Sequence, residues 1–255
     1  MKEGLFVRDV SKVYFVEKGI FLKKVQPKHV LKNVSLKLCP GEIVALVGES
    51  GSGKSTLAKI IAKLEKPDSG EVIIDGINAQ NFPSRVYGTK VGIVFQNPLT
   101  SLNPKLKVKT ILNEVIHLRK KVTGRSLFDL KTIAEIFSLD EKVLNAFPSQ
   151  ISGGQAQRVA IARSYAMFPN YLILDEVTSS LDVSTSAKIV KIFQNLNREF
   201  KTAMLFITHD LILAGLIANK IFVLKDGEIV EEGDTFKVLN FPENEYTQYL
   251  KESII

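Results

Sequence analysis

Residues 43–56 read IVALVGESGSGKST, and this stretch decides the fold. Its first five residues are apolar and mostly β-branched, which indicates a strand buried on both faces. A glycine-rich turn follows, and Leu57, Ile60 and Ile61 then recur at helical spacing. In this order of strand, loop and helix, the first amides of the helix can face a phosphate chain.

The loop has the spacing of a phosphate-binding loop, with glycines that let successive amide groups turn towards one anion. In such a loop Lys54 would reach the β- and γ-phosphates of a nucleotide, and the Ser55 hydroxyl would complete part of a Mg²⁺ shell. We therefore predict that ATP and Mg²⁺ are held by Gly48, Glu49, Ser50, Gly51, Ser52, Gly53, Lys54, Ser55 and Thr56.

Three further apolar runs, residues 91–95, 171–174 and 204–207, are similar to the first strand. Strands of this kind form a parallel sheet that is covered by helices. Helical periodicity lies between them, in residues 156–163 and 189–200. The alternation predicts an α/β core.

Two other patterns predict antiparallel strands and a helical insertion. Residues 30–38 alternate apolar and polar positions, as in a strand of an antiparallel sheet with one buried face. Asp226 and Gly227 separate two apolar segments and favour a type I′ hairpin. Residues 97–150 lack strong strand patterns and contain helical ones.

The composition argues against several structural features. Cys39 is the only cysteine and the three histidines are far apart in sequence, so we expect no disulfide and no protein-held metal cluster. The sequence has no apolar run of about 18 residues, and its first ten residues include charged ones where a signal peptide would need an apolar stretch, so we expect neither a membrane span nor a signal peptide.

The net charge of +7 and the pI near 9.3 can be explained in three ways. They fit a nucleic-acid partner, the anionic inner face of a membrane, or scattered solvated lysines. The basic clusters have few interleaved aromatic residues on which bases could stack. We therefore expect no nucleic-acid partner.

Two motifs carry further chemistry. YLILDE, residues 171–176, is an apolar strand that ends in two acids, which could hold Mg²⁺ and polarise water or could be ordinary helix caps and solvated carboxylates. ISGGQAQRVAIAR begins at Ile151 and places Ser152, Gly153 and Gly154 before a helix that starts near Gln155. This second helix N-terminus could hold an anion.

With these motifs in this order, the sequence resembles the nucleotide-binding subunits of ABC transporters, whose signature LSGGQ appears here as ISGGQ. The resemblance covers almost the whole chain. It implies a P-loop NTPase core of the RecA-like α/β class, with an antiparallel β subdomain and an inserted α-helical subdomain. The expected limits are residues 1–96 and 166–240 for the core and β subdomain, about 97–165 for the helical subdomain, and 241–255 for the tail.

The resemblance also implies residue roles. Glu176, His209 and Gln96 are the expected catalytic residues: Glu176 polarises the attacking water, His209 holds the γ-phosphate, and Gln96 senses Mg²⁺ and faces the membrane subunit. Asp175, together with Ser55 and Gln96, is an expected Mg²⁺ ligand. Tyr14 lies where the family stacks an aromatic ring on adenine, although an aromatic residue near a first strand is also commonly a core residue, and Phe15 is adjacent.

In that family two chains form two composite sites. The signature residues Ser152, Gly153, Gly154 and Gln155 then act on the nucleotide of the partner subunit, and Ser180, Leu181 and Asp182 contact that subunit. The implied partners are a second ABC ATPase, different or identical, two transmembrane permease subunits, and indirectly an extracytoplasmic solute-binding protein. The implied location is peripheral, at the cytoplasmic face of the cell membrane.

Two segments narrow the resemblance to importers. FQNPLTSLNP, residues 95–104, is similar to the FQDPxxSLNP of importers of peptides, opines and nickel, and the insertion at residues 13–36 resembles that of their second ATPase. Val177 replaces a common proline, and ENEYTQYL, residues 243–250, resembles HPYTxxL without its histidine. The sequence has no cysteine-bearing extension after this segment, so short peptides and nickel or metal chelates both remain expected cargoes.

Two rival functions are weighed against this one. The first is a non-transport ABC ATPase that acts on nucleic acid, which usually carries coiled-coil, zinc or tandem-domain insertions that this sequence lacks. The second is another phosphate-loop enzyme such as a kinase or GTPase, which would lack ISGGQ and the switch histidine. Transport is favoured over both.

Overall fold

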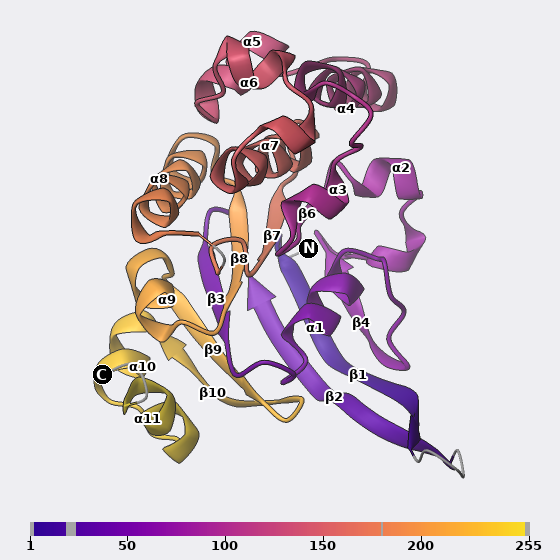
Figure 1. Ribbon diagram of the computed structural model, residues 1–255. Coiled ribbons are helices and arrows are strands. Elements are labelled where there is room, and N and C mark those ends of the chain that lie inside the picture. The colour runs from indigo at the N-terminus through magenta and orange to yellow at the C-terminus, as the bar shows by residue number, and fades with distance from the viewer. Residues whose placement is uncertain (1–2, 19–23, 180, 253–255) are drawn as a thin grey trace. The chain divides into compact units, whose positions relative to one another are not determined.

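The computed structural model describes residues 3–18, 24–179 and 181–252 (Figure 1). The chain forms two compact units, one made of residues 1–82 and 205–255 and the other of residues 83–204. Among the described residues, no helix combines the length and the apolar character that a membrane span requires.

The first unit contains an antiparallel sheet in the order β2-β1-β4-β5. Its strands are β1 (Leu5–Lys18), β2 (Lys24–Leu38), β4 (Ser69–Ile74) and β5 (Ile77–Asn78). The predicted antiparallel strand at residues 30–38 is confirmed, but β2 begins earlier. Residues 25–29 are all exposed, so they show no alternation of burial, and pairing with β1 holds them in the strand.

A second group of strands in this unit has the order β10-β9-β3-β8. It comprises β3 (Ile43–Val47), β8 (Ala203–Thr208, of which the first two residues belong to the second unit), β9 (Lys220–Lys225) and β10 (Glu228–Asp234). All five residues of β3 are buried, and β3 pairs with β9 in parallel. The predicted buried strand is therefore confirmed.

The β9–β10 connection is the predicted two-residue hairpin. Lys225 pairs with Glu228, and the two residues between them, Asp226 and Gly227, have φ values of 48° and 84°. A type I′ turn requires positive φ at both central positions. The helices of the first unit are α1 (Lys54–Ile61), the 3₁₀ helix η1 (Ala79–Asn81), α9 (Leu211–Ile217), α10 (Thr235–Asn240) and α11 (Glu245–Glu252).

The second unit contains the parallel pair β6 (Val91–Val94) and β7 (Tyr171–Asp175) together with helices. The helices are α2 (Ser84–Tyr87), α3 (Pro98–Ser101), α4 (Val108–Thr123), α5 (Leu130–Ile136), α6 (Glu141–Asn145), the 3₁₀ helix η2 (Pro148–Gln150), α7 (Gly153–Tyr165) and α8 (Val183–Phe200). In Figure 1, α4, α5 and α6 gather beside α7, which itself contacts β6. Residues 97–165 thus contain α3 to α7, and their assignment to a separate helical subdomain remains a prediction.

Aromatic rings tie the helices of this unit together. Tyr165, at the end of α7, packs on Phe137 with ring centroids 5.8 Å apart, and on Phe128, Phe168 and Phe200. Its hydroxyl lies 3.0 Å from Thr202 Oγ1, and burial raises the pKa of Tyr165 to about 12. The phenol therefore stays neutral inside the cluster.

Truncating this cluster should destabilise the chain strongly. Phe137 is completely buried, so Phe137→Ala should lower the free energy of unfolding by about 3–5 kcal/mol through lost burial and a residual cavity. Urea denaturation measures this. Phe15→Ala serves as the control because Phe15 is 74% exposed, and it should change the value by less than about 0.5 kcal/mol. Equal losses in the two variants would contradict the cluster's role.

Candidate functional site

The loop between β3 and α1 lies too close to its neighbours for side chains at two of its glycines. A Cβ atom on Gly48 would lie 2.2 Å from the carbonyl oxygen of Leu224, and one on Gly53 would lie 2.6 Å from that of Val30. Gly53 also has a φ of 113°, which L-residues rarely adopt. Both glycines are needed because β9 and β2 press against the loop.

The loop curls around the amine of Lys54. This side chain is only 4% exposed, and its Nζ donates hydrogen bonds to the carbonyl oxygens of Gly48 at 2.7 Å and Glu49 at 2.8 Å. From outside, the Gly227 N–H donates to the Ser52 carbonyl at 3.1 Å. The result is a cationic cradle at the N-terminus of α1.

The cradle fits a polyphosphate. Its charge is positive, and it opens a helix whose first amides point out of the N-terminus. A Cβ atom on Gly51 would meet no described atom within 4 Å, so the loop is open in that direction. The Ser52 hydroxyl is buried and has no hydrogen-bond partner among the described residues. Such a donor is costly to bury unless something is bound to it.

Two other predicted residues lie in the same unit. Tyr14 lies on β1 and is half-buried, with Lys12 Nζ 5.5 Å from the centre of its ring, whereas the adjacent Phe15 is exposed. His209 is exposed and directly follows β8, and its neighbour Asp210 caps α9 by accepting from Leu213 N. Adenine stacking by Tyr14 and γ-phosphate binding by His209 remain predictions.

In the second unit, the parallel pairing of β6 with β7 brings two predicted catalytic residues together. Gln96 Nε2 donates to Glu176 Oε2 at 3.1 Å, across 80 residues of sequence, and it also lies 3.2 Å from the Ser179 hydroxyl. Asp175 is the buried last residue of β7, with 4% exposure. Acid and amide groups thus meet at the carboxyl edge of the strands.

The backbone of Glu176 is in the left-handed region, with a φ of 49°. A residue of this kind stays in such a conformation only when its surroundings hold it there, and these residues cluster at functional sites. The Ser179 hydroxyl donates to the Glu176 carbonyl at 3.0 Å. Ser179 thus supports Glu176, a contact that sequence analysis did not predict.

The signature segment begins α7 as a capping box. The Ser152 hydroxyl accepts from Gln155 N at 3.3 Å, and the Gln155 side chain accepts from Ser152 N at 2.9 Å. A Cβ on Gly154 would lie 2.7 Å from the Thr185 methyl group, so this helix start abuts the first turn of α8. A Cβ on Gly153 would meet no described atom within 4 Å.

Asp182 caps α8, next to the signature segment. Its carboxylate accepts hydrogen bonds from the Ser184 hydroxyl at 2.7 Å and from both N and Oγ1 of Thr185. These bonds hold the pKa of Asp182 well below its usual range. Thr185 therefore links Asp182 to Gly154. Ser180, predicted to contact a partner subunit, lies outside the described residues.

The predicted site residues are thus divided between the units. The first carries Tyr14, the loop at residues 48–56 and His209; the second carries Gln96, Asp175, Glu176, the signature residues 152–155 and Asp182. Sequence analysis missed one contact of the loop, in which the Tyr246 hydroxyl accepts from Glu49 N at 2.9 Å. The two residues are 197 positions apart, and no known spacing connects them.

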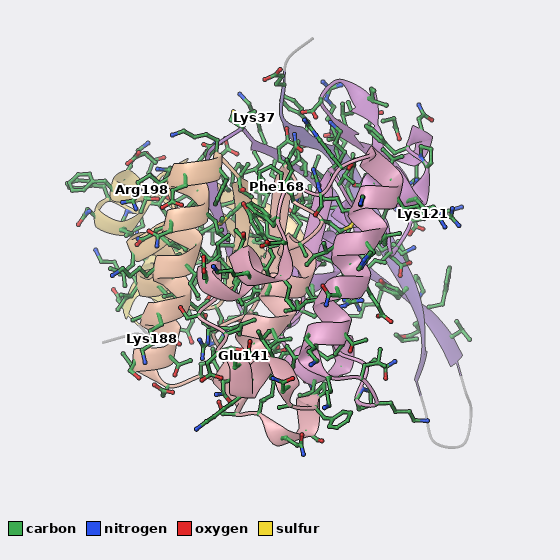
Figure 2. The ribbon with its side chains drawn as sticks, turned by 90° about the horizontal axis from the view of Figure 1, so that it is seen from above. Lys37, Lys121, Glu141, Phe168, Lys188 and Arg198 are labelled. Atoms are coloured by element: carbon green, nitrogen blue, oxygen red, sulfur yellow. The ribbon has the colours of Figure 1, made fainter. Side chains whose placement is uncertain are left out.

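The basic charge is spread over several elements. Lys121 on α4, and Lys188 and Arg198 on α8, are exposed and labelled in Figure 2. Lys37, on β2 in the first unit, is exposed as well. This distribution fits scattered solvated cations.

Comparisons with known proteins agree on one family. The family model for ABC transporters matches residues 31–179. The chain is 36% identical over 245 residues to the dipeptide transport ATP-binding protein DppF of Haemophilus influenzae, covering 94% of this chain and 75% of that protein. It is 39% identical over 231 residues to the nickel import ATP-binding protein NikE of Escherichia coli strain 536, covering 89% and 85%.

Another relative is longer. The uncharacterized ABC transporter ATP-binding protein YejF of Escherichia coli is 36% identical over 251 residues, and the chain spans only 47% of its length. Among solved structures, the ATP-binding cassette MJ0796, in a dimeric post-hydrolysis state bound to ADP and Pi, is 33% identical with a TM-score of 0.76. That match covers 91% of this chain and 98% of the MJ0796 chain. The likeness confirms the predicted fold class.

The crowding around the loop predicts a contrast between two glycine substitutions. Gly48→Ala should lower the free energy of unfolding by about 1–3 kcal/mol, because the added methyl group meets the rigid Leu224 backbone. At Gly153 the added methyl group would point into open space at the start of a helix. Gly153→Ala should therefore leave the free energy of unfolding unchanged or raise it by up to about 1 kcal/mol. Urea denaturation compares them, and a harmless Gly48→Ala would refute the close packing.

Proposed function

Because this chain belongs to the ABC transporter family, we propose that it binds and hydrolyses ATP to drive the import of a small solute. The observation that carries the proposal is the buried Lys54 amine inside a glycine cradle at the start of α1. That arrangement suits β- and γ-phosphates, which can replace the two carbonyl groups as partners of the amine. The match to MJ0796 bound to ADP and Pi supports it.

The proposed chemistry divides among named residues. The loop amides and Lys54 bind the phosphates, Ser55, Gln96 and Asp175 are the proposed Mg²⁺ ligands, and His209 holds the γ-phosphate. When bound, Mg²⁺ neutralises charge that develops on the phosphates. Glu176 accepts a proton from the attacking water, while its hydrogen bond from Gln96 orients the carboxylate.

We infer that catalysis needs two subunits. The signature helix start, residues 152–155, would act on the nucleotide of a partner ATPase, and Asp182 would face that partner. The dimeric MJ0796 structures support the assembly. A different second ATPase is the expected partner, with an identical one as the alternative, and size-exclusion chromatography of the chain with and without a co-expressed partner decides between them.

The cargo is proposed from the relatives. Their names include dipeptide transport and nickel import, so short peptides and nickel chelates are the two candidates. The chain would sit peripherally at the cytoplasmic face of the membrane, on two permease subunits that receive solute from an extracytoplasmic binding protein. Co-purification with a permease tests this, and co-purification with nucleic acid instead would support the alternative ATPase function.

Removing the cradle's cation should weaken nucleotide binding. Lys54→Ala should weaken ATP binding at least about tenfold, because charge-assisted hydrogen bonds to the phosphates are lost. Binding of a fluorescent ATP analogue and phosphate release measure the effect. Lys59→Ala changes an exposed lysine on the same helix and should behave like wild type. Near-normal hydrolysis by Lys54→Ala would refute the site.

Removing the proposed base should separate binding from turnover. Glu176→Gln should keep ATP affinity but slow hydrolysis by about a hundred- to ten-thousand-fold, and should trap an ATP-bound dimer. Phosphate release and size-exclusion chromatography with Mg-ATP, on this chain together with its partner ATPase, measure the two effects. Glu199→Gln, an exposed acid on α8, is the matched control. Turnover within a few-fold of wild type would remove Glu176 from catalysis.

A further inference from the structure

The C-terminal helix α11 reaches the phosphate-binding loop through one side chain. Tyr246, in its first turn, is 7% exposed, and its hydroxyl accepts the Glu49 N–H at 2.9 Å. Burial raises the pKa of Tyr246, so the phenol stays neutral. Lys225 Nζ lies 4.8 Å from the centre of the ring. The side chain is therefore held between β9 and the loop.

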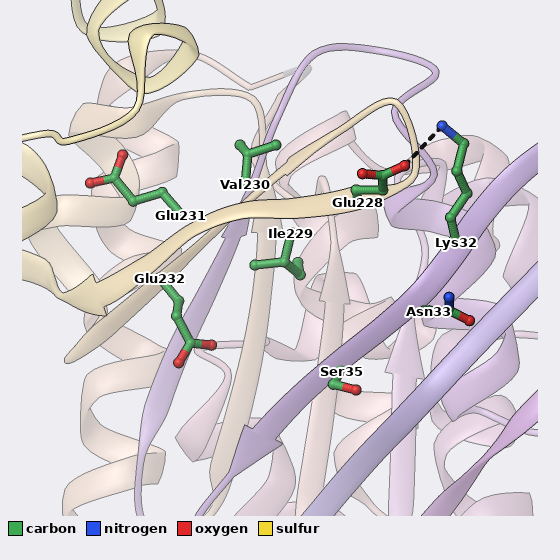
Figure 3. A pocket seen from close by; sticks show the side chains of 8 residues that line it. All are labelled: Lys32, Asn33, Ser35, Glu228, Ile229, Val230, Glu231 and Glu232. Carbon is green, nitrogen blue, oxygen red and sulfur yellow. Dashed lines mark hydrogen bonds and ion pairs between the residues drawn. The ribbon is translucent and has the colours of Figure 1, made fainter.

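The start of α11 is itself anchored to β10. The Glu231 carboxylate accepts the backbone N–H groups of Glu243 at 2.9 Å and Asn244 at 3.1 Å, and the Asn244 side chain accepts from Tyr246 N at 2.9 Å. Figure 3 shows Glu231 and Glu232 projecting to opposite sides of β10, with Glu228 paired to Lys32. A continuous series of contacts thus runs from β10 through residues 243–246 to the loop.

Tyr246 holds the part of the loop that has least packing. Glu49, Ser50 and Gly51 are exposed, whereas Gly48 is buried against β9 and Ser52 is buried with its carbonyl bonded to the β9–β10 turn. The Tyr246 bond pins the first residue of the exposed segment. A loop held in this way loses less conformational entropy when it closes on a ligand.

We propose that Tyr246 is a positioning residue for the phosphate-binding loop and that α11 is energetically coupled to nucleotide binding. The inference rests on the proposed binding of ATP at this loop. Coupling between two sites is reciprocal, so a nucleotide that orders the loop also stabilises the docked α11. The C-terminal segment is then part of the binding machinery although it touches no nucleotide.

The test compares two tyrosines of the same helix in the full chain. Tyr246→Phe removes only the hydroxyl that accepts Glu49 N–H, and Tyr249→Phe removes the hydroxyl of a 57% exposed ring. We expect Tyr246→Phe to raise the dissociation constant of a fluorescent ADP analogue and the KM for ATP by about three- to tenfold, the worth of one hydrogen bond. The kcat should stay within about twofold, and Tyr249→Phe should match wild type.

Hydrogen exchange provides a readout that a merely structural tyrosine would not move. In wild type, ADP should slow amide exchange in residues 245–252, and in Tyr246→Phe that protection should be lost or reduced. A wild-type chain that binds ADP without any change in this segment overturns the inference, as do equal dissociation constants for the two variants. A wild-type chain that binds no ADP overturns the proposed function and this inference together.

Discussion

The buried amine of Lys54 is the interaction on which the candidate site depends. An ammonium group at 4% exposure is costly unless it is fully hydrogen bonded, and here the carbonyl groups of Gly48 and Glu49 accept from it. These two carbonyls can point inward only if the loop curls tightly. The tight curl in turn brings the loop backbone against β9 and β2, where Gly48 and Gly53 leave no space for a Cβ.

Neighbouring elements of the first unit stabilise this tightly curled conformation of the loop. The β9–β10 turn donates the Gly227 N–H to Ser52, and its own positive φ values make that turn tight enough to do so. On the other side, Tyr246 accepts the Glu49 N–H. The loop is thus held near its start, at Glu49, and near its end, at Ser52, by segments that follow it by more than 170 residues. A cradle fixed in this way is ready for an anion without a large ordering cost.

In the second unit, contacts between neighbouring segments also hold the candidate site residues, here at the carboxyl ends of β6 and β7. The parallel pairing of β6 with β7 brings Gln96 to Glu176, and the left-handed backbone of Glu176 is held by the Ser179 hydroxyl. Close by in the same unit, Thr185 connects the Asp182 cap to the glycine of the signature segment. Gln96 is thus bonded directly to Glu176, and Asp182 is linked through Thr185 to Gly154, so we expect a substitution in either set to disturb the other members of that set.

The sequence by itself determined the strand, loop and helix at residues 43–61, the antiparallel strand at residues 30–38, the hairpin at Asp226 and Gly227, and the helices of the insertion. Each of these follows from local periodicity or from the conformational freedom of glycine. Both can be recognised within one continuous stretch of sequence. Only the tertiary structure decided that β2 extends over exposed residues, that Ser179 supports Glu176, and that Tyr246 holds Glu49. Those contacts depend on pairing partners or on side chains brought together from distant segments, and such proximity leaves no periodic pattern in the chain.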